Sequence, residues 1–320
     1  MAPRLITALT LTFLALGVPQ GPVLAACQFD QLAQLPVLPD NLRPVVGARI
    51  NGTAVSFVLD SGTFWSTISG ETASELKLSV YQDQPGYNII GGVVSSSIVT
   101  VKGFAVAELA SHDTVDFRVG EGDTGKAGLL GQDLLHGFDV EYDLVNRVIR
   151  LFKPRDCGHT VLAYWVKPEQ PYSVVHIDLA TRQQPHTVGA AFLNGAQIRV
   201  MLDLASSTSI LSLQAAAHAG VTPGTPGVVS AGLTHGLGRE RVPTWVAPFT
   251  SFKIGDEEIR NARLRIGDVA GLDTDLLLGA DFFQSHRVYI SSSQDQLYFT
   301  YNGGPVFELS TQAGGGAALR

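Results

Sequence analysis

The chain is poor in charge, and it has no run of basic residues. Only 16% of its 320 residues are charged, and the formal net charge is −7. An acidic chain without a basic run is a poor partner for nucleic acid or for an anionic membrane surface. After the first 26 residues, no stretch is long and apolar enough to span a bilayer. We therefore expect a soluble mature protein that neither binds nucleic acid nor spans a membrane.

The N-terminus has the pattern of an export signal. Arg4 supplies a positive charge, an apolar stretch follows from Leu5 to Val18, and small residues are frequent between Pro19 and Ala26. This pattern predicts a signal peptide over residues 1–26. The mature protein would then be exported, to a periplasm or to the medium.

Cysteine is scarce, with only Cys27 and Cys157 in the chain. In an exported protein, two cysteines most simply form a disulfide. The bridge would close a long loop and add about 3–5 kcal/mol of stability on the entropy model. A second reading remains open, because Leu24-Ala25-Ala26-Cys27 resembles a lipoprotein box in which Cys27 would be acylated.

Metal-binding and serine-hydrolase patterns are missing as well. The eight histidines, His186 among them, show no metal-ligand spacing. No Gly-x-Ser-x-Gly motif is present. We expect neither a metal nor a cofactor.

The chain does contain a duplicated unit built around an aspartate. An Asn-Gly pair leads through an apolar run to Asp60 in the first copy, and the same arrangement leads to Asp203 in the second. The spacing is the same in both copies, from Asn51 to Asp60 and from Asn194 to Asp203. Repeats this far apart indicate duplicated domains. Two carboxylates brought together across a pseudo-twofold axis can share one proton and activate water.

Each copy also closes with a matching apolar-apolar-Gly motif. Leu130 and Gly131 in the first copy correspond to Leu278 and Gly279 in the second. An aspartate follows two residues later in each case, at Asp133 and Asp281, and we interpret this pair as structural caps or turn bonds.

Short Val-, Ile-, Thr- and Phe-rich runs separated by Gly, Asn and Asp predict an all-β protein. The predicted organisation is a signal peptide (1–26), an N-terminal lead (27–44), lobe one (45–153), an inter-lobe connection (154–186), lobe two (187–301) and a disordered tail (302–320).

Asp60-Ser61-Gly62-Thr63 after an apolar strand, followed by an apolar-apolar-Gly motif, resembles the aspartic peptidase family, in particular its retroviral (retropepsin-like) branch in exported bacterial proteins. The resemblance covers nearly all of the mature chain. It implies two homologous pepsin/retropepsin-like β-barrel lobes related by a pseudo-twofold axis. It also implies an endopeptidase that acts on peptides or unfolded proteins as a monomer, with no metal.

The resemblance assigns the site residues. Asp60 and Asp203 would be the catalytic pair, sharing one proton and activating a water. The residues that follow each aspartate would support it, with the Thr63 and Ser206 hydroxyls holding the outer carboxylate oxygens: Ser61, Gly62, Thr63, Leu204, Ala205 and Ser206. Hairpin flaps would cover the site at Ile89–Val94, with Gly91 and Gly92, and at Ser230–Gly236, with Gly232.

The second copy departs from the family pattern. It has Leu204 and Ala205 where a hydroxyl residue and a glycine are expected. Ser61 would then face a leucine, which can neither donate nor accept a hydrogen bond. This departure keeps two alternatives open: a catalytically impaired peptide-binding or assembly protein, and a dimer that pairs Asp60 with Asp60.

Overall fold

A computed structural model describes residues 27–307, apart from positions 41, 90–91, 112, 121–124, 159, 185, 235–240 and 269–273. The side chains of 82–96 are likewise not described. The predicted signal peptide, the flap residue Gly91 and the tail beyond residue 307 therefore lie outside the described residues. Within them, 24 strands and four short helices confirm the all-β prediction.

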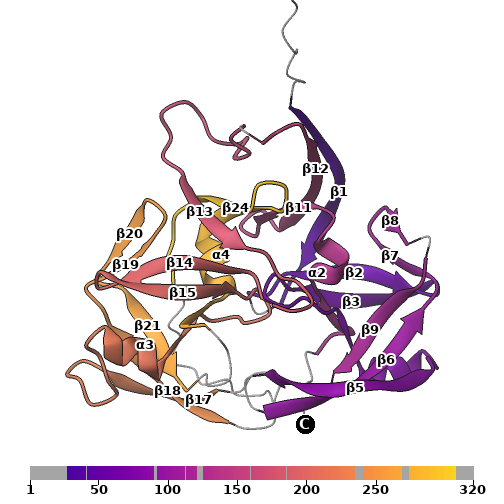
Figure 1. The fold of residues 1–320 in the computed structure, drawn as a ribbon, viewed down its shortest axis with the longest axis horizontal. Helices are drawn as coiled ribbons and strands as arrows, with labels where there is room; N and C mark the ends of the chain where they lie inside the picture. Colours follow the sequence, from indigo (N-terminus) through magenta and orange to yellow (C-terminus); the bar gives the residue numbers. More distant parts are fainter. Residues whose placement is uncertain are drawn as a thin grey trace, which may run out of the picture.

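Lobe one is a β-barrel-like unit, drawn in indigo to magenta in Figure 1. Its strands are β2 (Val45–Ile50), β3 (Thr53–Leu59), β4 (Thr67–Ser69), β5 (Val80–Ile89), β6 (Gly92–Val101), β7 (Phe104–Val106), β8 (Leu109–Ala110), β9 (Val115–Gly120) and β10 (Gly128–Leu130). Its helices are α1 (Gly70–Glu75) and α2 (Gln132–Leu135). Leu129 and Leu130 of the closing motif belong to strand β10.

Lobe two repeats this order, in red to orange in Figure 1. Its strands are β14 (Val188–Leu193), β15 (Ala196–Leu202), β16 (Ile210–Ser212), β17 (Val229–Thr234), β18 (Val242–Pro248), β19 (Ser251–Ile254), β20 (Glu257–Arg260), β21 (Arg263–Gly267) and β22 (Leu276–Leu278). Its helices are α3 (Leu213–His218) and α4 (Ala280–Ser285).

The turn that opens each lobe explains the repeated Asn-Gly pair. Asn51 and Gly52 have φ values of 50° and 84°, and Asn194 and Gly195 have values of 49° and 83°. Two consecutive positive φ angles define the tight hairpin turn that favours Asn-Gly. The turn fixes the register of the strand that leads to each aspartate.

A third sheet joins the two lobes and lies at the top of Figure 1. Its strands pair in the order β1 (Gln28–Leu38), β12 (Val148–Arg155), β11 (Asp139–Asp143), β23 (His286–Ser291), β24 (Gln296–Tyr301) and β13 (Ser173–Asp178). The lead segment thus contributes a strand to this sheet.

The lobes meet where β11 pairs with β23, and a buried charge cluster lies at this junction. Glu141, which is fully buried, pairs in register with Tyr289. Its carboxylate accepts hydrogen bonds from Arg150, Tyr164 and, from the other lobe, Arg287. A buried carboxylate is tolerated only when it is paired in this way.

Cys27 and Cys157 form a disulfide, as the sequence predicted. The bond ties the start of β1 to the segment after β12. A lipid anchor would require the same Cys27 sulfur atom, so the two modifications exclude each other on one molecule. Among the described residues, no helix has the length and apolar character needed to cross a bilayer.

Candidate active site

Asp60 is positioned by three strands at the centre of lobe one. Strand β10 runs parallel to β3, with Leu130 opposite Leu59, and antiparallel to β4. Leu59 is fully buried, and the Asp60 N–H donates to the Leu130 carbonyl oxygen at 2.8 Å. The apolar strand and the closing motif together fix the backbone from which the carboxylate projects.

Asp203 has the same support in lobe two. Strand β22 runs parallel to β15, with Leu278 opposite Leu202, and antiparallel to β16. The Asp203 N–H donates to the Leu278 carbonyl oxygen at 3.0 Å. The duplication seen in the sequence is therefore a duplication of geometry around each aspartate.

The closing glycines are required by close backbone packing. A β-carbon on Gly131 would lie 2.8 Å from the Phe64 carbonyl oxygen. A β-carbon on Gly279 would lie 2.9 Å from the Ser206 carbonyl oxygen. Since real β-carbons essentially never approach backbone atoms this closely, only glycine lets the loop after each aspartate rest on the closing motif.

Asp133 and Asp281 hold these loops and have a structural role, as the sequence suggested. Asp133 accepts hydrogen bonds from the Ser66 N–H at 2.9 Å and the Ser66 hydroxyl at 2.5 Å. Asp281 accepts the equivalent bonds from Ser209, at 2.9 and 2.6 Å. Burial raises the pKa of Asp133, and the bonds from Ser66 act against that rise.

The two halves of the site meet at Gly62. A β-carbon on Gly62 would lie 2.9 Å from Asp203 Cα and 2.5 Å from the Leu202 carbonyl oxygen. The Gly62 N–H donates to Asp60 Oδ1 at 2.8 Å, and the Ala205 N–H of lobe two lies near enough to the Asp60 carboxylate to lower its pKa. The structure thus brings together the two aspartates that the sequence singled out.

The aspartates share one electrostatic environment. Burial and the nearby Asp203 charge raise the pKa of Asp60 well above its ordinary value, against the backbone bonds from Gly62 and Ala205. Burial also raises the pKa of Asp203, while the backbone bond from Ser206 and the charge of His186 lower it. Asp60 is only 4% exposed, whereas Asp203 is half-buried. Proton loss from the pair is therefore a property of both residues together.

The supporting residues only partly match their predicted roles. The Ser206 N–H donates to Asp203 Oδ1 at 3.1 Å, but the Ser206 hydroxyl donates to the Thr208 carbonyl oxygen at 2.8 Å. The prediction that the Ser206 hydroxyl holds the carboxylate is wrong, because the turn presents the backbone N–H instead. In the described part of the chain, the Thr63 hydroxyl makes no hydrogen bond to Asp60.

The hydroxyl of Ser61 is left without a partner. Ser61 and Leu204 are both fully buried, and Ser61 Oγ has no hydrogen-bond partner among the described residues. This agrees with the expectation drawn from Leu204. The Tyr142 hydroxyl on β11 is also buried without a described partner, and its pKa is raised by burial and by the charge of Asp60.

Two contacts at the site have no counterpart in the sequence predictions. His186 Nδ1 lies 2.8 Å from the Gly62 carbonyl oxygen, although no role in the site was predicted for this histidine. Trp65 is half-buried, and two guanidinium groups lie over its ring. Those of Arg118 and Arg182 lie 4.1 and 5.5 Å from its ring centroid.

Two hairpins occupy the places predicted for flaps. β5 pairs with β6, and β17 pairs with β18. Both hairpins lie on the side of the molecule opposite the shared sheet in Figure 1. Gly92 starts β6 opposite Ile89, and Gly232 lies where the β17 register shifts, with a φ of 76°. Their role as flaps stays a prediction.

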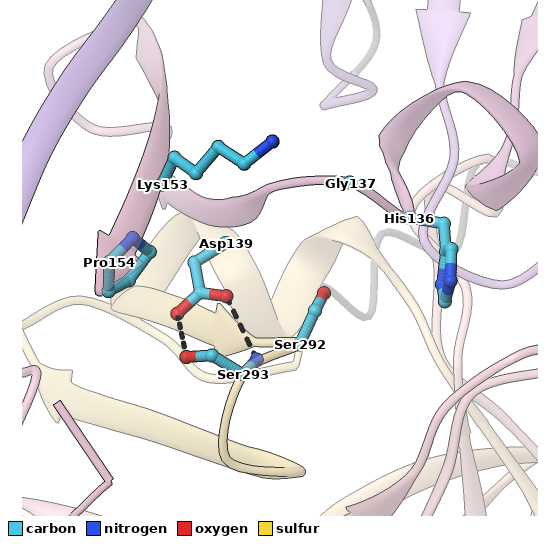
Figure 2. Close-up of a pocket in the computed structure, with 7 residues that line it drawn as sticks. All are labelled: His136, Gly137, Asp139, Lys153, Pro154, Ser292 and Ser293. Carbon is cyan, nitrogen blue, oxygen red and sulfur yellow. Dashed lines mark hydrogen bonds between the residues drawn. The ribbon is translucent and has the colours of Figure 1, made fainter. Parts of the chain in front are cut away.

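A polar pocket of about 180 Å³ borders the shared sheet (Figure 2) and is lined by His136, Gly137, Asp139, Lys153, Pro154, Ser292 and Ser293. Asp139 is 2% exposed, and its carboxylate accepts hydrogen bonds from Tyr289, Ser291 and Ser293. Burial raises its pKa, against the bonds from the serines. Asp139 is thus a structural carboxylate. The described residues contain no group of three or more His, Cys, Asp or Glu side chains that could hold a metal.

Comparison with known families agrees with the duplicated geometry. A sequence model described as aspartyl protease matches residues 46–134 and 189–282, which is more than half of the chain. Each matched region contains one of the two aspartates and its closing Leu-Gly pair. A search among curated proteins gives no match to the chain.

Proposed function

Because this chain belongs to the aspartyl protease family, we propose that it is an exported endopeptidase in which Asp60 and Asp203 activate a shared water. The observation that carries the proposal is the contact between Gly62 and the Asp203 backbone, which brings the two aspartate loops together. The raised pKa of Asp60 near the Asp203 charge adds support. The disulfide is compatible with export, because such bonds persist in oxidising compartments.

We assign different roles in hydrolysis to the two aspartates because their surroundings differ. Asp60 is the more deeply buried, and both burial and the Asp203 charge favour its protonated form. Asp203 is half-buried and has His186 nearby, so it is the charged member. Asp203 takes a proton from the water, which attacks the peptide carbonyl, while the Asp60 proton polarises the carbonyl oxygen.

An extended peptide or unfolded protein is the substrate class that suits this arrangement. Apolar side chains are exposed on the two predicted flap hairpins, with Tyr81 on β5 and Leu233 on β17 being 60% and 54% exposed. Peptides commonly bind to such edges as an added strand, with side chains in flanking pockets. We expect apolar residues next to the cleaved bond to be favoured.

Cleavage of an unfolded protein from acidic to neutral pH tests the proposal. Asp60→Asn and Asp203→Asn should each abolish cleavage, whereas Asp113→Asn, which changes an exposed aspartate, should leave it intact. A transition-state peptide inhibitor should block the wild type. Undiminished cleavage by either active-site variant would overturn the assignment.

A second candidate function is peptide binding without turnover, and the buried Ser61 hydroxyl, which has no hydrogen-bond partner among the described residues, favours it. Without a hydrogen bond from the Ser61 hydroxyl, the loop that carries Asp60 is held less firmly. Small misplacements of a reacting group are costly for catalysis. In that case Asp203→Asn should bind peptide as well as the wild type does. Leu204→Thr combined with Ala205→Gly separates the candidates: activity that appears only in this double variant identifies an impaired enzyme.

A further inference from the structure

We propose that His186 is a positioning residue for the aspartate pair, because it holds the Gly62 carbonyl of lobe one. The inference rests on the proposed function, since it gives His186 a part in the same chemistry.

The bond from His186 crosses between the lobes. His186 precedes β14, and its Nδ1 lies 2.8 Å from the carbonyl oxygen of Gly62, which is 124 positions away in the sequence. A carbonyl oxygen can only accept, so Nδ1 must be the donor whenever this bond exists. The second ring nitrogen, Nε2, can then gain or lose a proton without breaking the bond.

Gly62 is the point at which such a bond has most effect. Its N–H donates to Asp60 Oδ1 at 2.8 Å, and its Cα packs against the backbone of Asp203. His186 therefore holds a residue that contacts both aspartates. A shift of the Gly62 carbonyl would move the Asp60 carboxylate relative to Asp203.

His186 is itself firmly held at the base of the loop between β13 and β14, which reaches toward lobe one in Figure 1. The next residue, Thr187, is fully buried, and its hydroxyl accepts a hydrogen bond from the Ala180 N–H at 3.3 Å. The Thr187 carbonyl oxygen accepts from the N–H of Leu202, the residue before Asp203, at 3.1 Å. This chain of bonds fixes the position of His186 relative to Asp203.

The bond from His186 supplies the cross-lobe polar link that Leu204 cannot make. Ser61, directly before Gly62, is buried without a hydrogen-bond partner among the described residues, and a leucine side chain offers neither donor nor acceptor. The His186 bond reaches the same loop one residue further on. It fastens lobe one to lobe two at the level of the carboxylates.

The charge of His186 also acts unequally on the two aspartates. When protonated, His186 attracts the Asp203 carboxylate, and it is among the groups that lower the pKa of Asp203. Among the described residues, Tyr142 is a further titratable group near the pair, since the charge of Asp60 contributes to its raised pKa. Arg182 of the same loop is stacked on Trp65 with Arg118. An imidazolium on one side of the pair favours ionisation of the nearer carboxylate.

Two substitutions distinguish the effect of the His186–Gly62 hydrogen bond from the effect of the His186 charge. His186→Asn keeps an amide N–H near the place of Nδ1 but has no charge, and His186→Ala removes both. His176→Asn, which changes an exposed histidine on β13, is the matched control. For each variant, kcat and KM are measured against pH, together with the thermal unfolding midpoint.

We expect the acid limb of the kcat profile to move to higher pH in His186→Asn, with the plateau value of kcat retained. His186→Ala should show the same movement and lose about 10- to 100-fold in plateau kcat, as expected for a misplaced reacting group. His176→Asn should match the wild type. An unmoved acid limb in both His186 variants, or a wild-type plateau in a folded His186→Ala protein, would overturn the inference.

A second measurement does not depend on activity. The unfolding free energy is followed against pH for the wild type, His186→Asn, Asp203→Asn and the double variant. His186→Asn should destabilise the wild type but not the Asp203→Asn background, since the attraction needs both groups. If the wild type fails to cleave peptides yet this coupling is present, the proposed function falls and the His186–Asp203 interaction stands. Absent coupling refutes the inference whatever the activity.

Discussion

Gly62 lies directly against the backbone of Asp203, so close that a β-carbon on it would be 2.9 Å from Asp203 Cα. The two residues are 141 positions apart and come from different lobes. Their contact sets the distance between the lobes at the level of the carboxylates. A glycine in an aspartate loop thus has a steric role between domains as well as a local one.

Gly62→Ala should therefore separate the aspartate loops and abolish peptide cleavage, because the added methyl group has no room against the Asp203 backbone. The protein should also lose about 1–3 kcal/mol of unfolding free energy through overpacking. Gly47→Ala is the control, since a β-carbon there meets nothing within 4 Å. Cleavage and urea unfolding are measured for both. Normal activity in Gly62→Ala would contradict the described packing.

The raised pKa of Asp60 predicts a pH-dependent stability. A carboxyl group whose pKa is higher in the folded than in the unfolded protein favours folding when protonated. This contribution is complete below the unfolded pKa of about 3.9 and is lost as the pH rises through the folded pKa. Asp60→Asn, which stays neutral, should thus be more stable than the wild type at neutral pH. The advantage should vanish below about pH 4.

Denaturant unfolding at a series of pH values measures this difference, with Asp113→Asn as the exposed control. A constant offset between Asp60→Asn and the wild type at all pH values would mean that Asp60 titrates normally.

Removing the hydroxyl group from each of two buried serines next to the site should have different effects on the unfolding free energy. Ser66 Oγ donates to Asp133 and accepts from the Gly131 N–H, so Ser66→Ala should cost about 1–3 kcal/mol. Ser61 Oγ has no described partner, so Ser61→Ala should be neutral or slightly stabilising. Chemical unfolding of the two variants is the measurement. Equal destabilisation would show that Ser61 has a partner, such as a bound water.

Removal of the disulfide should weaken the fold. Cys27→Ser with Cys157→Ser frees a loop that spans 130 positions and should lower the unfolding free energy by about 3–5 kcal/mol. The bond lies at the shared sheet, so peptide cleavage by the folded variant should persist. Unfolding of the wild type with and without reductant provides the comparison. A variant as stable as the oxidised wild type would argue against the bond.

The elements that support each aspartate were predictable because their sequence signals are local. An Asn-Gly turn, an apolar strand and a closing glycine each require particular residue types within a few positions. Gly131 and Gly279 illustrate this, since no other residue fits against the loop they support. The fold and the aspartate pair could therefore be inferred from short patterns that occur twice.

The shared sheet and the role of His186 could not be inferred in this way. β11 pairs with β23 about 150 positions away, and His186 reaches Gly62 across 124 positions. Neither contact requires a distinctive residue pattern. The Ser206 hydroxyl was misassigned for a related reason, since its direction depends on the turn geometry of Asp203–Thr208 rather than on residue type.

Glu141 from one lobe and Arg287 from the other are paired inside a sheet that is continuous through both. Enzymes assembled from two identical subunits fall apart, and lose their active site, when they are diluted. In this chain both halves are covalently linked and share a hydrogen-bonded sheet, so the pairing of Asp60 with Asp203 is independent of protein concentration. Such a protein keeps its site assembled at any dilution at which the single chain stays folded.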